Sequence, residues 1–142
     1  MCIRDRQLCD PSPSSWGQGG YHDYWLNDTN AWVLPEWEKA AAAMVSRCSR
    51  GIAHEADLAL LEQAARELLL AQSSDWSFIF RSGTTTGLAK ERIERHLGRV
   101  WQLMAALDGH EPLPEDWLND VHNDDNIFPL VQPLDWAKLP QS

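Results

Sequence analysis

Apolar residues recur at steps of three and four along most of the chain, a spacing that predicts amphipathic α-helices. The first helix is expected from about Leu34 to Arg50, and its apolar face comprises Val33, Trp37, Ala41, Met44 and Cys48. Pro35 falls in the first turn, where a missing N–H costs no helical hydrogen bond. Gly51 supplies a stop signal.

Further helices are expected downstream. The second runs from about His54 to Gln72, with an apolar stripe of Leu58, Leu61, Ala65, Leu68 and Leu69. The Ser73–Asp75 segment interrupts it and can cap a short helix that carries Trp76, Phe78, Ile79 and Phe80.

A long helix from about Thr86 to Leu107 has the clearest stripe, formed by Ile93, Leu97, Val100, Trp101, Met104 and Leu107. A short acidic helix is expected from Pro114 to about Asn123, and the chain from Asn126 to Ser142 is expected to be extended.

The segment from Asp10 to Asn27 follows neither a helical nor a strand period. It combines prolines, serines and three glycines with four aromatic residues, a composition that predicts an ordered loop. No segment shows a strand period with flanking turns. We therefore expect an all-α fold, an antiparallel helical bundle with a long N-terminal loop rich in aromatic residues and glycine.

Charge limits the choice of partners. The formal net charge is −9, and the basic residues are scattered near acidic neighbours, whereas nucleic-acid binding needs clustered Lys and Arg. No apolar run approaches the ~20 residues of a membrane span. The N-terminus also lacks the layout of a signal peptide. Neither nucleic acid nor membrane is expected as a partner.

Metal and cofactor motifs are not found. Cys2, Cys9 and Cys48 are odd in number and lack ligand spacing, which fits a reducing cytoplasm better than disulfides or a zinc site. The histidines share no ligand spacing, and the acidic 116–125 stretch lacks the glycine and final glutamate of a calcium loop. The glycines at 17–20 do not continue into a phosphate-binding motif. We expect no metal and no cofactor.

The eight tryptophans are the most informative residues. Trp37 and Trp101 lie on apolar helix faces and are expected in the core, whereas Trp16 and Trp25 belong to no helical stripe. Composition alone favours packing of both loop indoles onto the bundle. The alternative is a platform on which a sugar ring stacks while its hydroxyls meet polar neighbours such as Tyr21, His22, Asp23 and Asn27.

Several motifs resemble one known family. The strings are Ser14-Ser15-Trp16-Gly17-Gln18-Gly19-Gly20-Tyr21, Trp25-Leu26-Asn27 with Trp32, Ala71-Gln72-Ser73-Ser74-Asp75-Trp76 with Phe78, Arg92 with His96, and Asp125-Asn126-Ile127-Phe128-Pro129. In this order they are similar to the C-terminal helical domain of glycoside hydrolase family 57 α-glucan branching enzymes, over about residues 11 to 136.

The resemblance implies an activity for a larger enzyme. Such an enzyme cleaves an α-1,4-glucan and transfers the segment to a 6-hydroxyl, with retention, through a covalent glycosyl-enzyme intermediate. In the family the two catalytic carboxylates lie on an upstream β/α barrel, so the expected partners are an α-1,4-glucan and that barrel. No catalytic residue is expected in this chain, which would be inactive alone.

The resemblance also implies substrate-binding residues. It places Trp16 and Trp25 along the glucan cleft, opposite the barrel, with Tyr21, Asp75 and Trp76 as further candidates. Capping and helix packing are the alternative roles for Asp75 and Trp76. Gln18, where the family often has an acidic residue, and the Leu88-Ala89 pair depart from the family pattern. A related family 57 α-amylase and a non-catalytic helical protein-interaction domain remain alternatives.

The first six residues differ in character from the rest. Residues 1–6, Met-Cys-Ile-Arg-Asp-Arg, resemble translated sequencing adapter. We therefore expect the natural sequence to begin near Gln7, residues 7–142 to form the helical domain, and the chain to be a piece of a longer protein.

Overall fold

The computed structural model describes residues 10–109 and 112–138 and confirms the all-α fold. Within these residues the elements are α-helices and short 3-10 helices, with no strand. The α-helices are α1 (Leu34–Ser49), α2 (Glu55–Ala71), α3 (Ser74–Ser82), α4 (Thr86–Leu107) and α5 (Trp117–Asp124). The 3-10 helices are η2 (Gln18–Gly20) and η3 (Pro133–Lys138). Residues 1–6, which resemble translated sequencing adapter, lie outside the described part of the chain, and so does Cys9.

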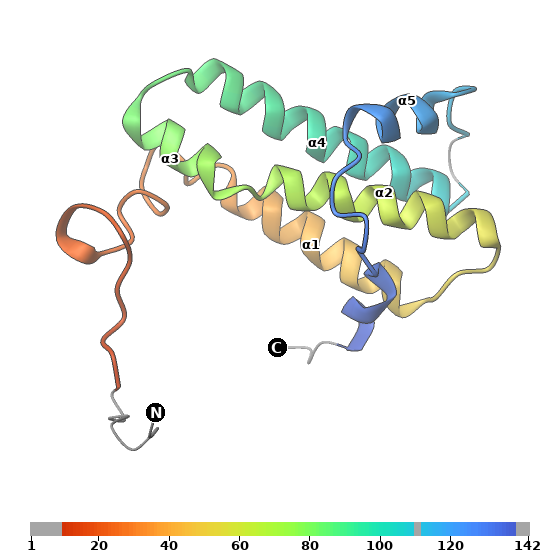
Figure 1. Cartoon of the computed structure of the whole chain (residues 1–142), viewed down its shortest axis with the longest axis horizontal. Helices are drawn as coiled ribbons and strands as arrows, with labels where there is room; N and C mark the ends of the chain where they lie inside the picture. The colour runs from red at the N-terminus through yellow and green to blue at the C-terminus, as the bar shows by residue number, and fades with distance from the viewer. Residues whose placement is uncertain (1–9, 110–111, 139–142) are drawn as a thin grey trace, which may run out of the picture.

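The three long helices form an antiparallel bundle (Figure 1), in which α2 runs opposite to both α1 and α4. Their apolar faces meet in one core, whose fully buried members include Val33, Ala40, Met44, Leu61, Ala64, Ala65, Ile93, Val100 and Leu103. Trp37 and Trp101 pack at the edge of this core, as their place on apolar faces predicted. The bundle therefore follows directly from the helical stripes.

Local signals account for the helix ends. Pro35 lies in the first turn of α1, and Gly51 adopts a positive φ of 70° just after that helix. At the start of α2, the Asp57 carboxylate accepts hydrogen bonds from the backbone N–H groups of His54 (3.1 Å) and Ala53 (3.0 Å). These hydrogen bonds hold the pKa of Asp57 below its usual value. Gly83 ends α3 with a left-handed conformation.

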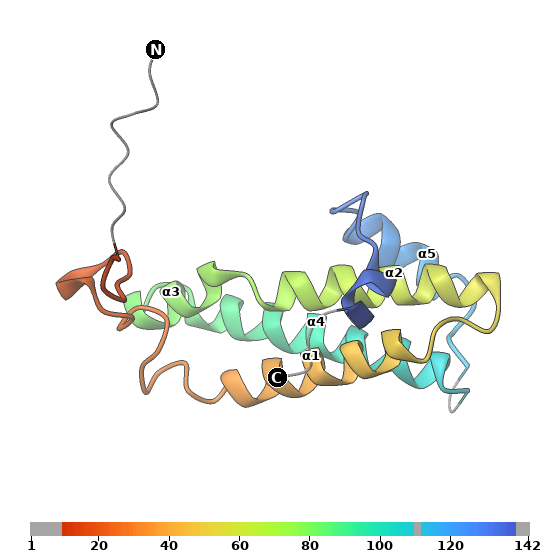
Figure 2. The same cartoon turned by 90° about the horizontal axis from the view of Figure 1, so that it is seen from below.

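Two sequence expectations were wrong. The tail expected to be extended contains η3, which packs against α1 and α2 and buries Pro133. The last α-helix begins at Trp117 instead of Pro114, because Asp116 has a φ of 61°, which the right-handed helix excludes. Figure 2 shows the segment between α5 and η3 projecting away from the long helices.

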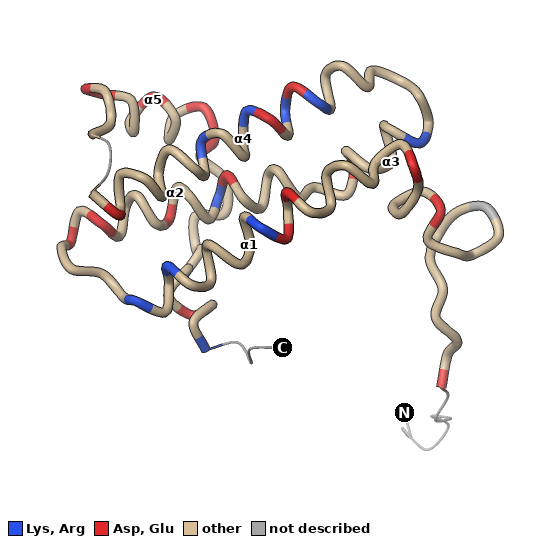
Figure 3. Tube along the Cα trace, turned by 180° about the vertical axis from the view of Figure 1, so that it is seen from behind, with Lys and Arg blue, Asp and Glu red and all other residues tan. Residues whose placement is uncertain are grey.

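Charges of both signs share the helix surfaces. Figure 3 shows Lys and Arg interleaved with Asp and Glu along the first half of α4, and acidic residues around α5. Lys90 and Glu94, for example, form an exposed ion pair at 3.6 Å on one face of α4. No helix in the described residues is both long and apolar enough to cross a membrane.

Candidate binding surface

Four aromatic rings meet at the α3 end of the bundle. This aromatic cluster comprises Trp16, Tyr24, Trp25 and Phe78. Trp16 and Trp25 stand edge to face, with ring centroids 6.3 Å apart and planes at 74°. Tyr24 lies against both indoles and stacks on Phe78, with centroids 5.1 Å apart and planes at 16°. These separations are those of favourable aromatic pairs.

A tight turn brings Trp16 back toward Tyr24. Gly17 has a φ of 121°, and the Ser15 N–H donates to the Gly20 carbonyl at 2.8 Å across the turn. A Cβ at Gly17 would lie 2.9 Å from the Tyr24 ring, so the backbone approaches that ring more closely than any other residue type allows. The glycines of this loop therefore serve close packing of backbone on aromatic rings.

Asn30 holds the loop backbone through hydrogen bonds within the loop. Its side chain is fully buried, and its Oδ1 accepts a hydrogen bond from the Asn27 backbone N–H at 3.0 Å. The Asn30 amide also donates to the Tyr24 carbonyl at 3.4 Å, and the Asn27 amide donates to the Asp23 carbonyl at 2.7 Å. The backbone that carries Tyr24 and Trp25 is thus held by side-chain hydrogen bonds as well as by ring packing.

Helix α3 connects this loop to the core. Phe78 contacts the loop rings, and the Arg81 guanidinium lies 5.8 Å from the Tyr24 ring centroid. Phe80 meets Trp32 edge to face at 5.7 Å. Trp76 anchors the helix itself, because its Nε1–H donates to the Leu70 carbonyl at 2.8 Å and its ring packs against the core.

The structure brings some predicted site residues together and separates others. Trp16 and Trp25 lie in one cluster, and Trp16 remains 70% exposed. Tyr21 is 69% exposed on the same loop. Asp75 is exposed and accepts a hydrogen bond from the Ser73 hydroxyl at 3.3 Å, while Trp76 is half-buried. The contacts of Asp75 and Trp76 are therefore those of a helix start and a core anchor.

Sequence reasoning missed Tyr24 and Phe78 as members of the cluster. Tyr24 is next to Trp25, yet nothing in the local pattern distinguishes a central ring from a peripheral one. Phe78 lies more than fifty residues away along the chain, and only the packing of α3 brings it to the loop. Its place two residues after Trp76 was the one available signal.

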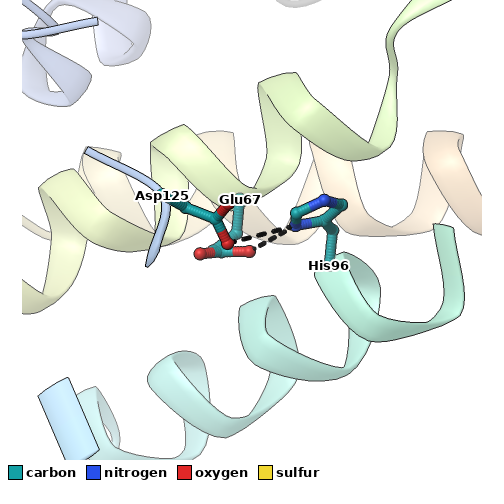
Figure 4. A group of neighbouring side chains, drawn as sticks. All are labelled: Glu67, His96 and Asp125. Atoms are coloured by element: carbon teal, nitrogen blue, oxygen red, sulfur yellow. Dashed lines mark hydrogen bonds and ion pairs between the residues drawn. The ribbon is translucent and has the colours of Figure 1, made fainter. Parts of the chain in front are cut away.

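A second group of polar side chains is buried between α2 and α4 (Figure 4). Glu67 is fully buried, and its Oε2 lies 2.7 Å from Nδ1 of His96. Gln63 donates to the other Glu67 oxygen at 3.0 Å, and Asp125 reaches the same place from the end of α5. The Arg99 guanidinium contacts Asp125 and lies 3.7 Å from Glu67. The buried carboxylate is thus paired on two sides.

Ligand-type atoms of Glu67, His96 and Asp125 lie within 4.8 Å of one another, a grouping that the histidine spacing could not show. Arg99, however, already places a positive charge against both carboxylates. A metal ion would have to compete with that guanidinium for the same oxygens. We therefore interpret the group as an ion-pair network that ties the end of α5 to the bundle.

The projecting segment forms an apolar tip, defined as residues 127–130. Leu130 is 88% exposed, and Ile127 and Phe128 are also exposed. The buried Arg66 donates from Nε to the Ile127 carbonyl at 3.0 Å, and Phe128 holds a positive φ of 53°. A bulky residue rarely adopts that conformation, so the surrounding contacts enforce it. A pocket of about 480 Å³ lies between this tip, Leu69 and Trp136.

Comparison with known proteins gives consistent results. The family model for the C-terminal part of 1,4-alpha-glucan branching enzymes matches residues 36–136. The 1,4-alpha-glucan branching enzyme of Thermococcus kodakarensis is 36% identical over 122 residues, which cover 82% of this chain and 18% of that enzyme. The chain therefore spans about a fifth of the length of this relative.

Solved structures show the same likeness. A branching enzyme of the glycoside hydrolase family 57 type from Pyrococcus horikoshii superposes with a TM-score of 0.79 and 30% identity, over 91% of this chain and 25% of that one. The Thermococcus kodakaraensis enzyme of the same family, crystallised with glucose, superposes with a TM-score of 0.77 and 30% identity, over 85% of this chain and 23% of that one.

Proposed function

This chain belongs to the C-terminal domain family of the 1,4-α-glucan branching enzymes of glycoside hydrolase family 57, and from this we propose that it forms one wall of a glucan-binding cleft. The observation that carries the proposal is the aromatic cluster, in which Trp16 keeps 70% of its surface exposed while Trp25 stands edge to face against it. An exposed indole face is a surface on which the C–H face of a pyranose ring stacks. Tyr21 adds a second exposed ring on the same loop.

We propose that the larger enzyme transfers a segment of α-1,4-glucan to a 6-hydroxyl with retention of configuration. We place the nucleophile and the acid/base carboxylate outside this chain, on a β/α barrel. The buried carboxylate of Glu67 does not suit either role, because it is fully enclosed and paired with His96. The aromatic wall holds the glucan segment and excludes water from the covalent intermediate, which favours transfer over hydrolysis.

The test uses a chimera in which this chain replaces the matching segment of the Thermococcus kodakarensis enzyme. Trp16→Leu and Trp25→Leu are each expected to lower kcat/KM for amylose branching by roughly tenfold or more, because each removes a stacking face. Trp32→Leu is the matched control, since Trp32 is a loop tryptophan that contacts Phe80 instead of the cluster. If Trp16→Leu and Trp25→Leu branched amylose with the same kcat/KM as the Trp32→Leu control and the wild type, the stacking role would be wrong. The chain alone should not turn over amylose.

For the partner, we place the contact with the catalytic part of the enzyme at the apolar tip. Three neighbouring large side chains are exposed there, the Arg66 Nε–H group donates to the Ile127 carbonyl, and Phe128 has a positive φ. Apolar groups gathered on a rigid surface mark a protein contact. Because the chain spans about a fifth of its relative, the occupant of this surface is the remaining polypeptide of the enzyme.

The same tip favours the competing function, a helical protein-interaction domain without a glucan site. Tryptophan fluorescence of the chain, titrated with maltoheptaose and in parallel with cellobiose, separates the two functions. A shift with maltoheptaose alone supports the glucan wall. A response to neither sugar, together with unchanged activity of the Trp16 and Trp25 variants, favours the interaction domain.

We also propose a cytoplasmic location. The support is the burial of Cys48 as a free thiol, whose pKa is raised by desolvation. Non-reducing electrophoresis of the protein purified from its native cells should show no intermolecular disulfide. A disulfide-linked species would contradict a reducing compartment.

A further inference from the structure

We infer that Tyr24 is a positioning residue that sets the orientation of Trp16 and Trp25, and that Phe78 and Arg81 of α3 hold Tyr24 in place. The inference rests on the proposed glucan wall, because the two tryptophans are its stacking surface. Tyr24 itself is only part-exposed, and its role is to act through the indoles.

Tyr24 contacts all three other rings of the aromatic cluster. Its centroid lies 5.9 Å from that of Trp16 and 6.2 Å from that of Trp25, so it supports both indoles at once. Because 70% of the Trp16 surface is exposed, only a small part of this side chain is covered by neighbouring groups. The orientation of this indole therefore depends on the few rings that it touches, and Tyr24 is one of three.

Helix α3 fixes Tyr24 through two side chains on one helical face. Phe78 and Arg81 are three residues apart and therefore project side by side. The Phe78 ring stacks on Tyr24 at 5.1 Å, and the Arg81 guanidinium lies over the same ring at 5.8 Å. A ring that carries both an aromatic stack and a cation–π contact has few alternative rotamers.

The backbone confines Tyr24 as well. Gly17 lies so close to the ring that a Cβ there would meet Tyr24 Cδ2 at 2.9 Å. The Asn30 amide donates to the Tyr24 carbonyl at 3.4 Å. The ring and its backbone are thus held by the loop turn, by α3 and by a buried asparagine.

This arrangement organises the stacking surface before the glucan binds. Immobilising a large side chain on binding reduces affinity, and a ring that is already fixed avoids that loss. All the contacts that confine Tyr24 except the Asn30 hydrogen bond are made with its ring. We therefore expect Tyr24→Phe to preserve the surface and Tyr24→Leu to release both indoles.

The first measurement is independent of activity. Indole N–H resonances of the ¹⁵N-labelled 142-residue chain are assigned with Trp16→Phe and Trp25→Phe. Tyr24→Leu and Phe78→Leu should move the resonances of Trp16 and Trp25 and leave those of Trp37 and Trp101 in place. Phe80→Leu is the matched control, because Phe80 is on the same helix but contacts Trp32. Unmoved Trp16 and Trp25 resonances in Tyr24→Leu would overturn the inference.

The second measurement uses the chimera. Tyr24→Leu should lower kcat/KM for amylose branching by about tenfold, Arg81→Gln by about threefold, and Tyr24→Phe should retain the wild-type value. If Trp16→Leu is impaired while Tyr24→Leu is not, the positioning role is wrong and the glucan wall stands. If neither variant is impaired, the glucan wall fails too. Far-ultraviolet circular dichroism and the Tm confirm that each variant remains folded.

Discussion

Oε2 of Glu67 lies 2.7 Å from Nδ1 of His96, and both side chains are buried between α2 and α4. Burying two polar groups costs desolvation, so the net contribution of their hydrogen bond to stability is small while both partners are present. Removing one partner leaves the other polar group enclosed without its partner. His96→Leu is therefore expected to lower the free energy of unfolding by about 3 kcal/mol, measured by urea denaturation.

The double variant Glu67→Leu/His96→Leu separates pairing from packing. It should lose less stability than the sum of its single variants, because neither member of the pair is left without the other. Glu94→Gln on the same helix is the matched control, since the Lys90–Glu94 pair is exposed and should contribute less than about 0.5 kcal/mol. A His96→Leu variant as stable as this control would contradict the network interpretation.

Chelation tests the reading of the Glu67, His96 and Asp125 group as an ion-pair network. Dialysis against EDTA should leave the Tm unchanged, because Arg99 already compensates the charge of both carboxylates. Arg99→Gln should lower the Tm under the same conditions. A Tm that falls with EDTA and recovers with added Zn²⁺ would establish a metal site here.

Replacement by alanine should stabilise the protein at one glycine and disturb the binding loop at another. Gly98→Ala should raise the free energy of unfolding by about 0.5–1 kcal/mol, because Gly98 lies inside α4 with open space at its Cβ position. Gly17→Ala should instead disturb the loop, since its φ is 121° and Tyr24 fills the space. Chemical denaturation measures the first effect and chimera branching the second. Wild-type branching by Gly17→Ala would count against the described turn.

The Asp57 carboxylate makes the start of α2 sensitive to acid. The His54 N–H hydrogen bond, reinforced by that of Ala53, holds the pKa of Asp57 below its ordinary value. The resulting stability is present above the unfolded-state pKa and is lost as the pH falls through the folded-state pKa. Asp57→Ala should therefore be less stable than wild type at pH 7, and the difference should vanish in acid. A difference in Tm that stays constant with pH would contradict this assignment.

Docking through the apolar tip can be measured directly. Leu130→Glu should weaken binding of this chain to the separately expressed catalytic part of the Thermococcus kodakarensis enzyme, because it places a charge in an apolar contact. Leu88→Glu is the control, since Leu88 is an exposed leucine at the start of α4. Calorimetry gives the affinities. Self-association of the chain that Leu130→Glu abolishes would instead identify a second copy as the occupant.

Local patterns were sufficient for the helices of the bundle. The α4 bounds follow from the apolar stripe that begins after the Thr84–Thr86 run and stops before Gly109. Helical periodicity and end signals act within one or two turns, so the sequence contains them in readable form. The same signals did not predict η3, because that segment has no local period. Its shape follows from the packing of Pro133 and Trp136 against other elements.

The binding surface, too, was predicted only in part from the sequence. Sequence by itself predicted a loop rich in glycine and aromatic residues before the bundle, and it assigned Trp16 and Trp25 to no helical face. Only the tertiary structure decided that Tyr24 lies against both indoles and that Phe78 contacts Tyr24 and Trp16. It also brought Glu67 and His96, twenty-nine residues apart, into one pair. Such contacts depend on how α2, α3 and α4 pack against one another, and local sequence patterns do not predict that packing.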